Sequence, residues 1–505
     1  MFYRTFLVFL TGLLFNFSAS VIAKPNTPKQ ILTPNQLNTS IGTLEFFDGV
    51  PSKNTVKKAY NYLDTMRGVQ VFLRFIPVAS LYMMCEGLTH VSKSSYAKPK
   101  VMLTENFMDS TALFLTANTS TIYATTCLDL KKTGPTVVEV PQRLLGAFDD
   151  ARFLYMQDIG PVGPDKGKGG KYIILPPGYQ GKIPAGYYPV KSQTYKVWLF
   201  GRGLLENGTR KNVVNRIKRQ LKIYPLSKVH NPPKTVFYNG SNRFYNTIHA
   251  NNFEFFNEIN AVIQHEPADI FTVEERGLRA SIGIIKGKPF RPSRDMRKIL
   301  TDAAYIGNAI ARAIVFYPRD PNAKRYSNRG SKWVVGFING NVYFLNKDGS
   351  RNLDARTMFH YPYTGVTPAM ATKVAGRGSD YAMAYVDSKG RALNGSNRYK
   401  LHLPANIPAK DFWAITIYDT QTRSLLQTSQ KYPTLSSQNK RLTANEDGSY
   451  DIYFGPTSPK DKENNWLQTI PNKSWFVILR IYGPLNPWLN KTWRPGNIKK
   501  IKHLH

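Results

Sequence analysis

The C-terminal third of the chain is a succession of short runs of aromatic and β-branched residues separated by turns. The runs read WVVGFI (333–338), NVYFL (341–345), YAMAYVD (381–387), YKLHLP (399–404), DFWAITIYD (411–419), YDIYFGP (450–456) and WFVILRIYGP (475–484). This pattern predicts antiparallel strands joined by tight turns, and from Asp447 to Gly496 we expect such strands to close one sheet. Because so many short strands need two facing sheets, we predict a β-sandwich or jelly roll.

The length of the chain, 505 residues, allows two or three domains with separate cores. A hydrophobic content of 42%, with 29 tyrosines and 28 phenylalanines, is typical of a folded protein and favours β structure. The two cysteines, Cys85 and Cys127, form either one disulfide or two isolated buried thiols. The chain has no CxxC pair and no Cys/His cluster, so we predict no cysteine-based metal site.

The first 23 residues have the features of a secretory signal peptide. Arg4 is their only charge, residues 6–17 are an apolar run, and Val21-Ile22-Ala23 fits a cleavage site. The apolar run is too short to span a bilayer comfortably. A second apolar segment, Val69 to Met84, is interrupted by Arg74 and Pro77, which predicts a buried helix and a following turn. We therefore expect an exported protein, periplasmic or secreted.

The charge is strongly basic, with 68 Lys and Arg against 33 Asp and Glu, a formal +35. Such an excess favours an anionic polymer or a membrane surface as partner, although a generally basic, solvated surface explains it as well. Export and the lack of a recognition motif count against nucleic acid. The best local patch is a predicted helix from Lys211 to Lys222, whose outward basic residues are Lys211, Arg216, Lys218, Arg219 and Lys222.

Further helices are predicted at residues 53–75, at residues 253–264 and from Ser293 to Phe316. In the last of these, Ser293 is the expected N-cap. The expected buried ridge of this helix is Ile299, Ala303, Ile306, Ile310 and Ile314. The prediction is an α+β protein with a β-rich N-terminal domain (24–245), a helical connecting region (246–320) and a C-terminal β-sandwich (321–505).

A Gly/Lys-rich loop, Gly160 to Gly170, looks superficially like a phosphate-binding loop. It runs into a predicted strand, Lys171 to Leu175, whereas phosphate loops open a helix N-terminus. We therefore expect an ordinary loop.

Two groups of motifs resemble those of an exported two-domain family, known as paired domains of unknown function twelve fifty-four (N-terminal) and twelve fourteen (C-terminal). The first group is residues 118–141 with GPDKGKGGKYIILPPGYQG, and the second is LNGSNRYKLHLP, DFWAITIYD, DGSYDIYFGP, NNW, LRIYGP and TWRPG. The resemblance implies two β-sandwich-like domains with helices between and around them, and it implies no agreed activity. Members usually carry an Asp where this chain has Ser120, which puts a shared catalytic role in doubt.

The candidate catalytic residues are Asp158, Asp380 and His360. Asp158 and Asp380 lie near strand ends without an obvious turn role, so they are the candidate pair of acids for glycoside hydrolysis. His360, among tyrosines in FHYPY, is either a base or a hydrogen-bonded structural residue. Trp466 could stack on a sugar ring, although tryptophans usually pack in cores. No GxSxG or HExxH motif is present.

Arg202 and Arg480 each lie at a predicted strand, in GRG and LRIYGP. Each arginine either ties the two sheets together through carboxylates and carbonyls or binds a ligand. The sequence thus predicts an exported, oligomeric binding or structural protein with an anionic partner, or alternatively a secreted polysaccharide hydrolase. It names no cofactor and does not decide whether the protein is an enzyme.

Overall fold

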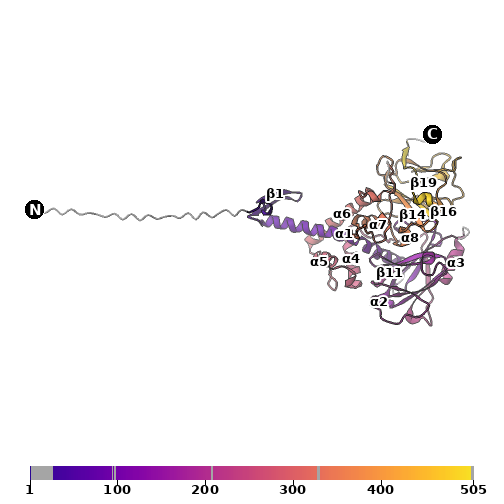
Figure 1. Ribbon diagram of the computed structural model, residues 1–505, viewed down its shortest axis with the longest axis horizontal. Helices are drawn as coiled ribbons and strands as arrows, with labels where there is room; N and C mark the ends of the chain where they lie inside the picture. Colours follow the sequence, from indigo (N-terminus) through magenta and orange to yellow (C-terminus); the bar gives the residue numbers. More distant parts are fainter. Residues whose placement is uncertain (2–26, 94, 96–97, 206–208, 327–329, 502–505) are drawn as a thin grey trace. The chain divides into compact units, whose positions relative to one another are not determined.

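The computed structural model describes residue 1 and residues 27–93, 95, 98–205, 209–326 and 330–501 (Figure 1). The predicted signal peptide therefore lies outside the described residues, apart from Met1. The chain divides into two compact units, Met1–Leu63 and Asp64–His505.

The first unit contains a small antiparallel sheet of β1 (Gln36–Thr39), β2 (Gly42–Phe47) and β3 (Val50–Pro51). Helix α1 (Lys53–Ser92) begins in this unit and continues into the second. Inside the first unit, the amide of Glu45 donates to Thr55 Oγ1 at 2.8 Å, and Lys58 Nζ donates to the carbonyl of Thr43 at 2.9 Å. These bonds join the sheet to the first turns of the helix.

The second unit begins with a sandwich of two sheets. The six-stranded sheet has the order β13-β4-β5-β11-β7-β8 and comprises Val236–Asn239, Lys100–Leu103, Ile122–Asp129, Lys196–Gly203, Leu144–Asp150 and Tyr155–Ile159. The four-stranded sheet has the order β10-β9-β6-β12 and comprises Tyr188–Lys191, Gly170–Leu175, Thr136–Val140 and Lys222–Pro225. Apolar residues of both sheets, among them Leu128 and Tyr172, share one buried core.

A second sandwich forms the C-terminal part. One sheet has the order β14-β20-β16-β17 and comprises Ser379–Ala384, Trp475–Pro484, Ala409–Asp419 and Thr434–Ser436. The facing sheet has the order β19-β18-β15-β21 and comprises Trp466–Gln468, Tyr450–Gly455, Arg398–Leu403 and Lys499–Ile501. The prediction that Asp447 to Gly496 closes one sheet is wrong, because β18 and β20 lie in opposite sheets and face a shared core. β18 and β19 are also parallel, so the sheets are mixed.

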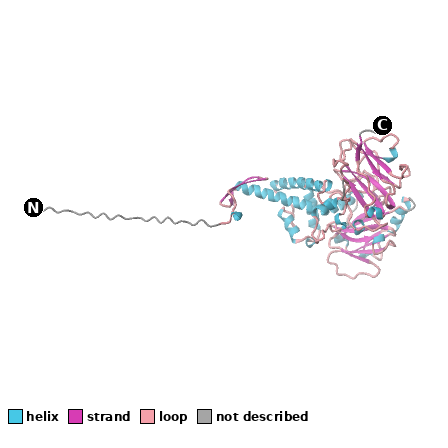
Figure 2. Cartoon of the chain, turned by 45° about the horizontal axis from the view of Figure 1, so that its top comes forward, coloured by secondary structure: helices cyan, strands magenta, loops and turns pink. Residues whose placement is uncertain are grey.

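A third and larger core packs helices against the outer faces of both sandwiches. Strand β11 shows how this works: Val197 and Leu199 point into the first sandwich, while Trp198 and Phe200 point into the helical core. The helices are α4 (Glu254–His265), α5 (Val273–Ser281), α6 (Arg294–Phe316) and α7 (Leu353–His360), together with the later turns of α1. Figure 2 shows these helices grouped beside the strands. Shorter helices are α2 (Leu130–Thr133), α3 (Arg210–Gln220), α8 (Pro368–Ala371) and α9 (Asn486–Leu489).

Two predictions about local structure are wrong. Helix α1 does not end near residue 75 but continues through Pro77 to Ser92. A proline removes only one backbone donor, and the buried apolar residues around it keep this helix packed in the core. The runs WVVGFI and NVYFL are not strands: the structure forms only isolated bridges and a 3-10 turn there. Their aromatic residues, such as Phe337 and Phe344, stack on each other in the helical core.

Helix α6 confirms its predicted extent and N-cap, since Ser293 Oγ accepts from the amide of Met296 at 3.2 Å. Its predicted ridge is displaced by about one position. The residues that are buried are Leu300, Ala303, Ala304, Gly307, Ala311 and Val315. Ile306 is 44% exposed, because Gly307 and Ala303 allow a close approach of α1 at Phe72 and Gly68. Small residues thus take the contact face that the isoleucines were expected to occupy.

Two described helices, α1 and α6, are long and apolar enough to cross a bilayer by length and composition alone. Each helix has one most apolar window of 18 residues. The buried share of this window is 67% in α1 and 33% in α6. A core helix of a folded domain meets the same criteria.

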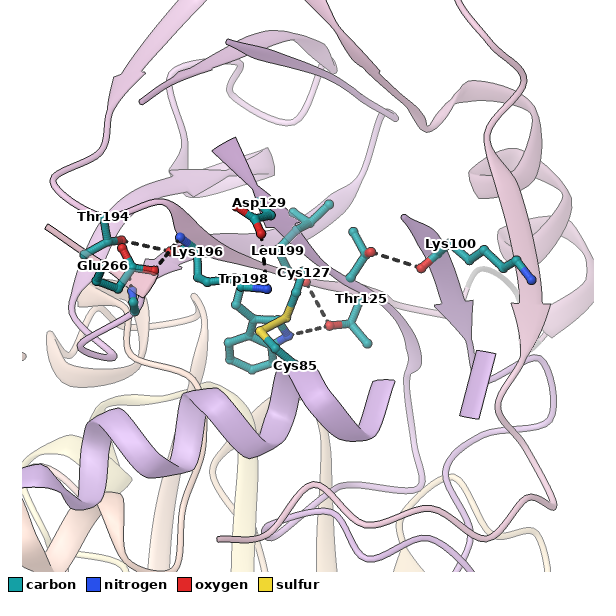
Figure 3. Close-up of a disulfide and its surroundings, with 12 residues drawn as sticks. Cys85, Lys100, Thr125, Cys127, Asp129, Thr194, Lys196, Trp198, Leu199 and Glu266 are labelled. Atoms are coloured by element: carbon teal, nitrogen blue, oxygen red, sulfur yellow. Dashed lines mark hydrogen bonds and ion pairs between the residues drawn. A yellow bond between two sulfur atoms is a disulfide. The ribbon is translucent and has the colours of Figure 1, made fainter. Parts of the chain in front are cut away.

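The two cysteines form a disulfide, which settles the alternative left open by the sequence. Cys85 comes from α1 and Cys127 from β5, and the bond lies between the helix and the sheet (Figure 3). The indole of Trp198 lies beside it, and its Nε1 donates to Thr125 Oγ1 at 2.6 Å. The disulfide therefore anchors the helical core to the first sandwich.

A buried carboxyl group on α4 makes stability depend on pH. Glu258 accepts one hydrogen bond from the amide of Ala250 at 2.9 Å, and its second oxygen has no hydrogen-bond partner among the described residues. Burial raises the pKa of Glu258 to about 8. Between its ordinary value and this one, the folded protein binds a proton that the unfolded chain does not. The free energy of unfolding should therefore fall as the pH rises, by up to about 1.4 kcal/mol per pH unit.

We expect Glu258→Gln to abolish this part of the slope and to unfold at a higher urea concentration than the wild type at pH 8. Urea unfolding at pH 5, 6.5 and 8 measures how the free energy of unfolding changes with pH in each protein. Glu254→Gln, at an exposed position of the same helix, is the matched control and should keep the wild-type slope. Equal slopes for wild type and Glu258→Gln would contradict the assignment.

Candidate functional site

Two adjoining pockets meet at the side chain of Arg202, which lines both. The inner pocket, about 50 Å³, has mostly apolar walls and reaches Arg480 and Tyr381. The outer pocket, about 590 Å³, is lined on its polar side by Thr121, Arg143, Arg377, Ser379, Asp411 and Tyr482. Its apolar walls include Leu145 and Phe412. The two pockets thus combine hydrophobic walls with a few convergent polar groups, as small-molecule sites do.

The two arginines of the inner pocket are almost fully buried, at 6% exposure for Arg202 and 5% for Arg480. Arg480 Nη2 donates to the carbonyl of Thr116 at 2.6 Å and to Tyr418 Oη at 2.7 Å. Within the part of the chain that the structure describes, no carboxylate forms an ion pair with either arginine, and both Nε atoms lack a partner. Buried cations are normally paired with anions, so this pair leaves an anionic position unfilled.

Tyrosines surround the two guanidinium groups. Burial by itself raises the pKa of Tyr381, but the positive charges of Arg202 and Arg480 outweigh burial and hold that pKa below its usual value. The Tyr381 hydroxyl also forms a hydrogen bond of 2.9 Å with Ser379 Oγ. The two guanidinium groups therefore stabilise negative charge at this wall of the pocket.

The loop before β5 positions the pocket wall through Asn118. Asn118 Oδ1 accepts from the amide of Ser120 at 2.9 Å and from the amide and hydroxyl of Thr121 at 2.9 and 3.0 Å. Its Nδ2 donates to Tyr123 Oη at 2.8 Å. Tyr123 is the neighbour of Arg202 across the β5–β11 pair. Residues 117–123 (ANTSTIY) thus form a hydrogen-bonded turn that holds two pocket residues, Thr121 and Tyr123, in place.

The predicted acid pair, Asp158 and Asp380, does not line either pocket at Arg202. Asp158 accepts from Thr367 Oγ1 at 2.6 Å, and burial raises its pKa. Asp380 accepts from Arg325 at 3.0 Å, from Lys373 at 2.6 Å and from Trp488 Nε1 at 2.8 Å. Each acid is therefore bound to separate partners, and the structure does not bring the two together in a described pocket.

His360 is buried at the end of α7 among the rings of Phe153, Phe344 and Phe359. Burial, together with Arg356 and Arg351, holds its pKa well below its usual value, so the ring is neutral. Its Nδ1 has no hydrogen-bond partner. It lines neither pocket at Arg202, and its surroundings are those of a packed ring.

The predicted basic helix forms as α3, Arg210–Gln220, with Val213 and Ile217 buried. Lys218 pairs with Glu105 at 2.7 Å, and Lys222, which lies in β12, pairs with Glu139 at 3.3 Å. The other predicted binding residues of this segment are Lys211 and Arg219, both exposed, and Arg216, which is half-buried. Two of the basic side chains are thus balanced by acids of the protein itself.

The Gly/Lys-rich loop is organised by an internal carboxylate. Asp165 accepts from the amides of Gly160 at 2.7 Å and Gly169 at 3.1 Å, and from Tyr172 Oη at 2.6 Å. The aspartate thus already binds two amides of the loop. This agrees with the prediction that the segment is an ordinary loop and not a phosphate-binding loop. Among the residues described, no group of three or more His, Cys, Asp or Glu side chains lies close enough to hold a metal ion.

Two family models match the chain at the two sandwiches. "Protein of unknown function (DUF1254)" matches residues 100–225, and "Protein of unknown function (DUF1214)" matches residues 378–486. The chain is a two-domain DUF1254–DUF1214 protein. The predicted resemblance is confirmed. Arg202 and Tyr123 belong to the DUF1254 domain, whereas Tyr381 and Arg480 belong to the DUF1214 domain, so residues of both domains line the inner pocket.

A solved structure shares the fold. The VPA0106 protein from Vibrio parahaemolyticus is 18% identical with a TM-score of 0.52, over 87% of this chain and 100% of that one. A putative uncharacterized protein from Burkholderia cenocepacia is 13% identical with a TM-score of 0.39, over 88% of this chain and 96% of that one. A search of curated proteins found no match.

Proposed function

We propose that this protein is an exported binding protein for a small organic carboxylate, which Arg202 and Arg480 hold between the two domains. The observation that carries the proposal is the pair of buried guanidinium groups without a described carboxylate partner. A guanidinium fork matches a planar carboxylate in two parallel hydrogen bonds. The bound anion would offset the cost of burying two cations in one pocket.

The apolar walls of the two pockets indicate which kind of organic group the bound carboxylate would carry. The inner pocket offers Phe337, Met370 and Ile478, and the outer pocket offers Leu145 and Phe412. These surfaces suit an aromatic or short aliphatic body. The anionic partner in this proposal is a small molecule. Two basic residues of the α3 segment, Lys218 and Lys222, are already paired with acids of the protein.

Two features support the proposal that the protein is exported. The N-terminal 23 residues have the composition of a signal peptide, and disulfides such as Cys85–Cys127 persist in oxidising compartments.

Binding is tested by calorimetry and thermal unfolding with benzoate, hexanoate, methyl benzoate and inorganic phosphate. We expect the two carboxylates to bind and raise the unfolding temperature, and the neutral ester to do neither. Arg202→Gln and Arg480→Gln should each weaken binding about tenfold to a hundredfold, because each removes charged hydrogen bonds.

Arg219→Gln, on the exposed face of α3, is the matched control and should bind like the wild type. Circular dichroism without ligand separates lost binding from lost folding. Equal binding of the ester and benzoate, binding of phosphate alone, or no binding by the folded wild type would each overturn the proposal.

A further inference from the structure

A separate pocket of about 330 Å³ lies in the DUF1214 domain. One of its lining residues, Trp466, is the first residue of β19, which Figure 1 labels. Two aromatic residues, Tyr432 and Trp466, line it, and both are half-buried. None of its lining residues belongs to the pockets at Arg202. The site is therefore independent of the carboxylate pocket.

The aromatic residues are held in fixed positions. Trp466 Nε1 donates to the carbonyl of Gly455 at 2.9 Å, and Gln430 Nε2 donates to the carbonyl of Trp466 at 3.1 Å. Tyr432 Oη donates to the carbonyl of Asn106 at 2.7 Å. Because the indole N–H and the phenol O–H already donate to carbonyls, the rings offer a ligand mainly their apolar surfaces. A preorganised aromatic platform loses little entropy on binding.

The rim of this pocket is polar and has unused hydrogen-bonding capacity. It comprises Asn439, Arg441, Glu463 and Asn464, which are exposed and for which no side-chain partner is described. Asn465 fixes the spacing of the rim, since its Oδ1 accepts from the amide of Thr443 at 2.9 Å and its Nδ2 donates to the carbonyls of Thr443 at 2.7 Å and Asp451 at 3.0 Å. The rim thus presents donors and acceptors together on a supported frame.

We propose that this pocket binds one ring of a neutral saccharide. A sugar ring has an apolar C–H face that stacks on an aromatic side chain and an edge of hydroxyls that both donate and accept. Amides, a guanidinium and a carboxylate around an aromatic platform match this combination. Lys431 and Arg441 on one hand and Glu463 on the other give the lining charges of both signs, and the volume suits a single ring whose neighbours extend into solvent.

Calorimetry with cellotetraose, maltotetraose and tetra-N-acetylchitotetraose tests the proposal. We expect one of them to bind, with little dependence on salt. Trp466→Ala should weaken this binding at least tenfold, because it removes the stacking surface. Glu463→Gln and Asn464→Ala leave the platform in place and should each weaken it about threefold to tenfold.

Arg202→Gln serves as the matched control and should leave saccharide binding unchanged, which separates this site from the carboxylate site. Thermal unfolding of each variant shows that it is folded. The proposal is overturned if no tetrasaccharide binds the wild type at about 10 mM, a level at which even very weak binding is detected. It is also overturned if the folded Trp466→Ala variant and both folded rim variants bind the tetrasaccharide with wild-type affinity.

Discussion

Replacing Cys85 and Cys127 together with alanine is expected to lower the free energy of unfolding by about 4 kcal/mol. The disulfide joins residues 42 positions apart, and without it the unfolded chain gains the entropy of an open loop of that length. The loss should be large because the bond connects α1 to β5, across the junction of the helical core and the first sandwich. Urea unfolding of the wild type and the double variant measures it.

Reduction of the wild type provides an internal control for this prediction. Dithiothreitol should shift its urea midpoint to that of the double variant, and the reagent should leave the double variant unchanged. If the oxidised wild type and the double variant unfold at the same midpoint, the disulfide does not stabilise the fold.

Asp380→Ala should cost about 3–5 kcal/mol, because it leaves the cation of Arg325 buried without its anion. Arg325 is 5% exposed, pairs with Asp380 at 3.0 Å and lies over the ring of Trp488 at 3.8 Å. Trp488 Nε1 loses its acceptor as well. Lys373→Gln is the matched control, since Lys373 is a partly exposed partner of the same carboxylate and its removal should cost about 1 kcal/mol or less.

This contribution of Asp380 depends on pH in the opposite sense to that of Glu258. Burial alone raises the pKa of Asp380, but Lys373 and Arg325 outweigh it and hold the pKa below its usual value. The stabilisation is therefore present above about pH 4 and is lost as the pH falls further. The difference in unfolding free energy between wild type and Asp380→Ala should be smaller at pH 3 than at pH 7. A folded variant of wild-type stability would instead favour the catalytic interpretation of Asp380.

The sequence pattern predicted the strands of both sandwiches well. Residues of YKLHLP alternate between buried and more exposed positions, and DFWAITIYD is an aromatic and β-branched run that is buried without interruption from Phe412 on. The prediction failed where tertiary contacts override local pattern. WVVGFI and NVYFL have strand composition, yet their rings pack against α7 as irregular chain. The pattern also could not show that β18 and β20 lie in opposite sheets.

The candidate site was only partly visible in the sequence. GRG and LRIYGP drew attention to Arg202 and Arg480, but their common pocket depends on strands separated by more than two hundred residues. Asn118 lies in one of the family motifs, but the sequence indicates no role for it. Nothing in the sequence marks Tyr381 as a pocket residue. Asp158 and Asp380 looked free because their partners, Thr367 and Arg325, are distant in the chain.

The two-sided burial of strands such as β11 has a consequence for how this architecture is inherited. One face of β11 serves its own sandwich, and the other supplies Trp198 and Phe200 to a core that also receives Phe476 and Ile478 from the second sandwich. A gene fragment encoding either sandwich alone would expose that shared apolar surface to water. We therefore expect the two sandwich domains to be expressed together and to evolve together. They should not be exchanged between genes as independent modules.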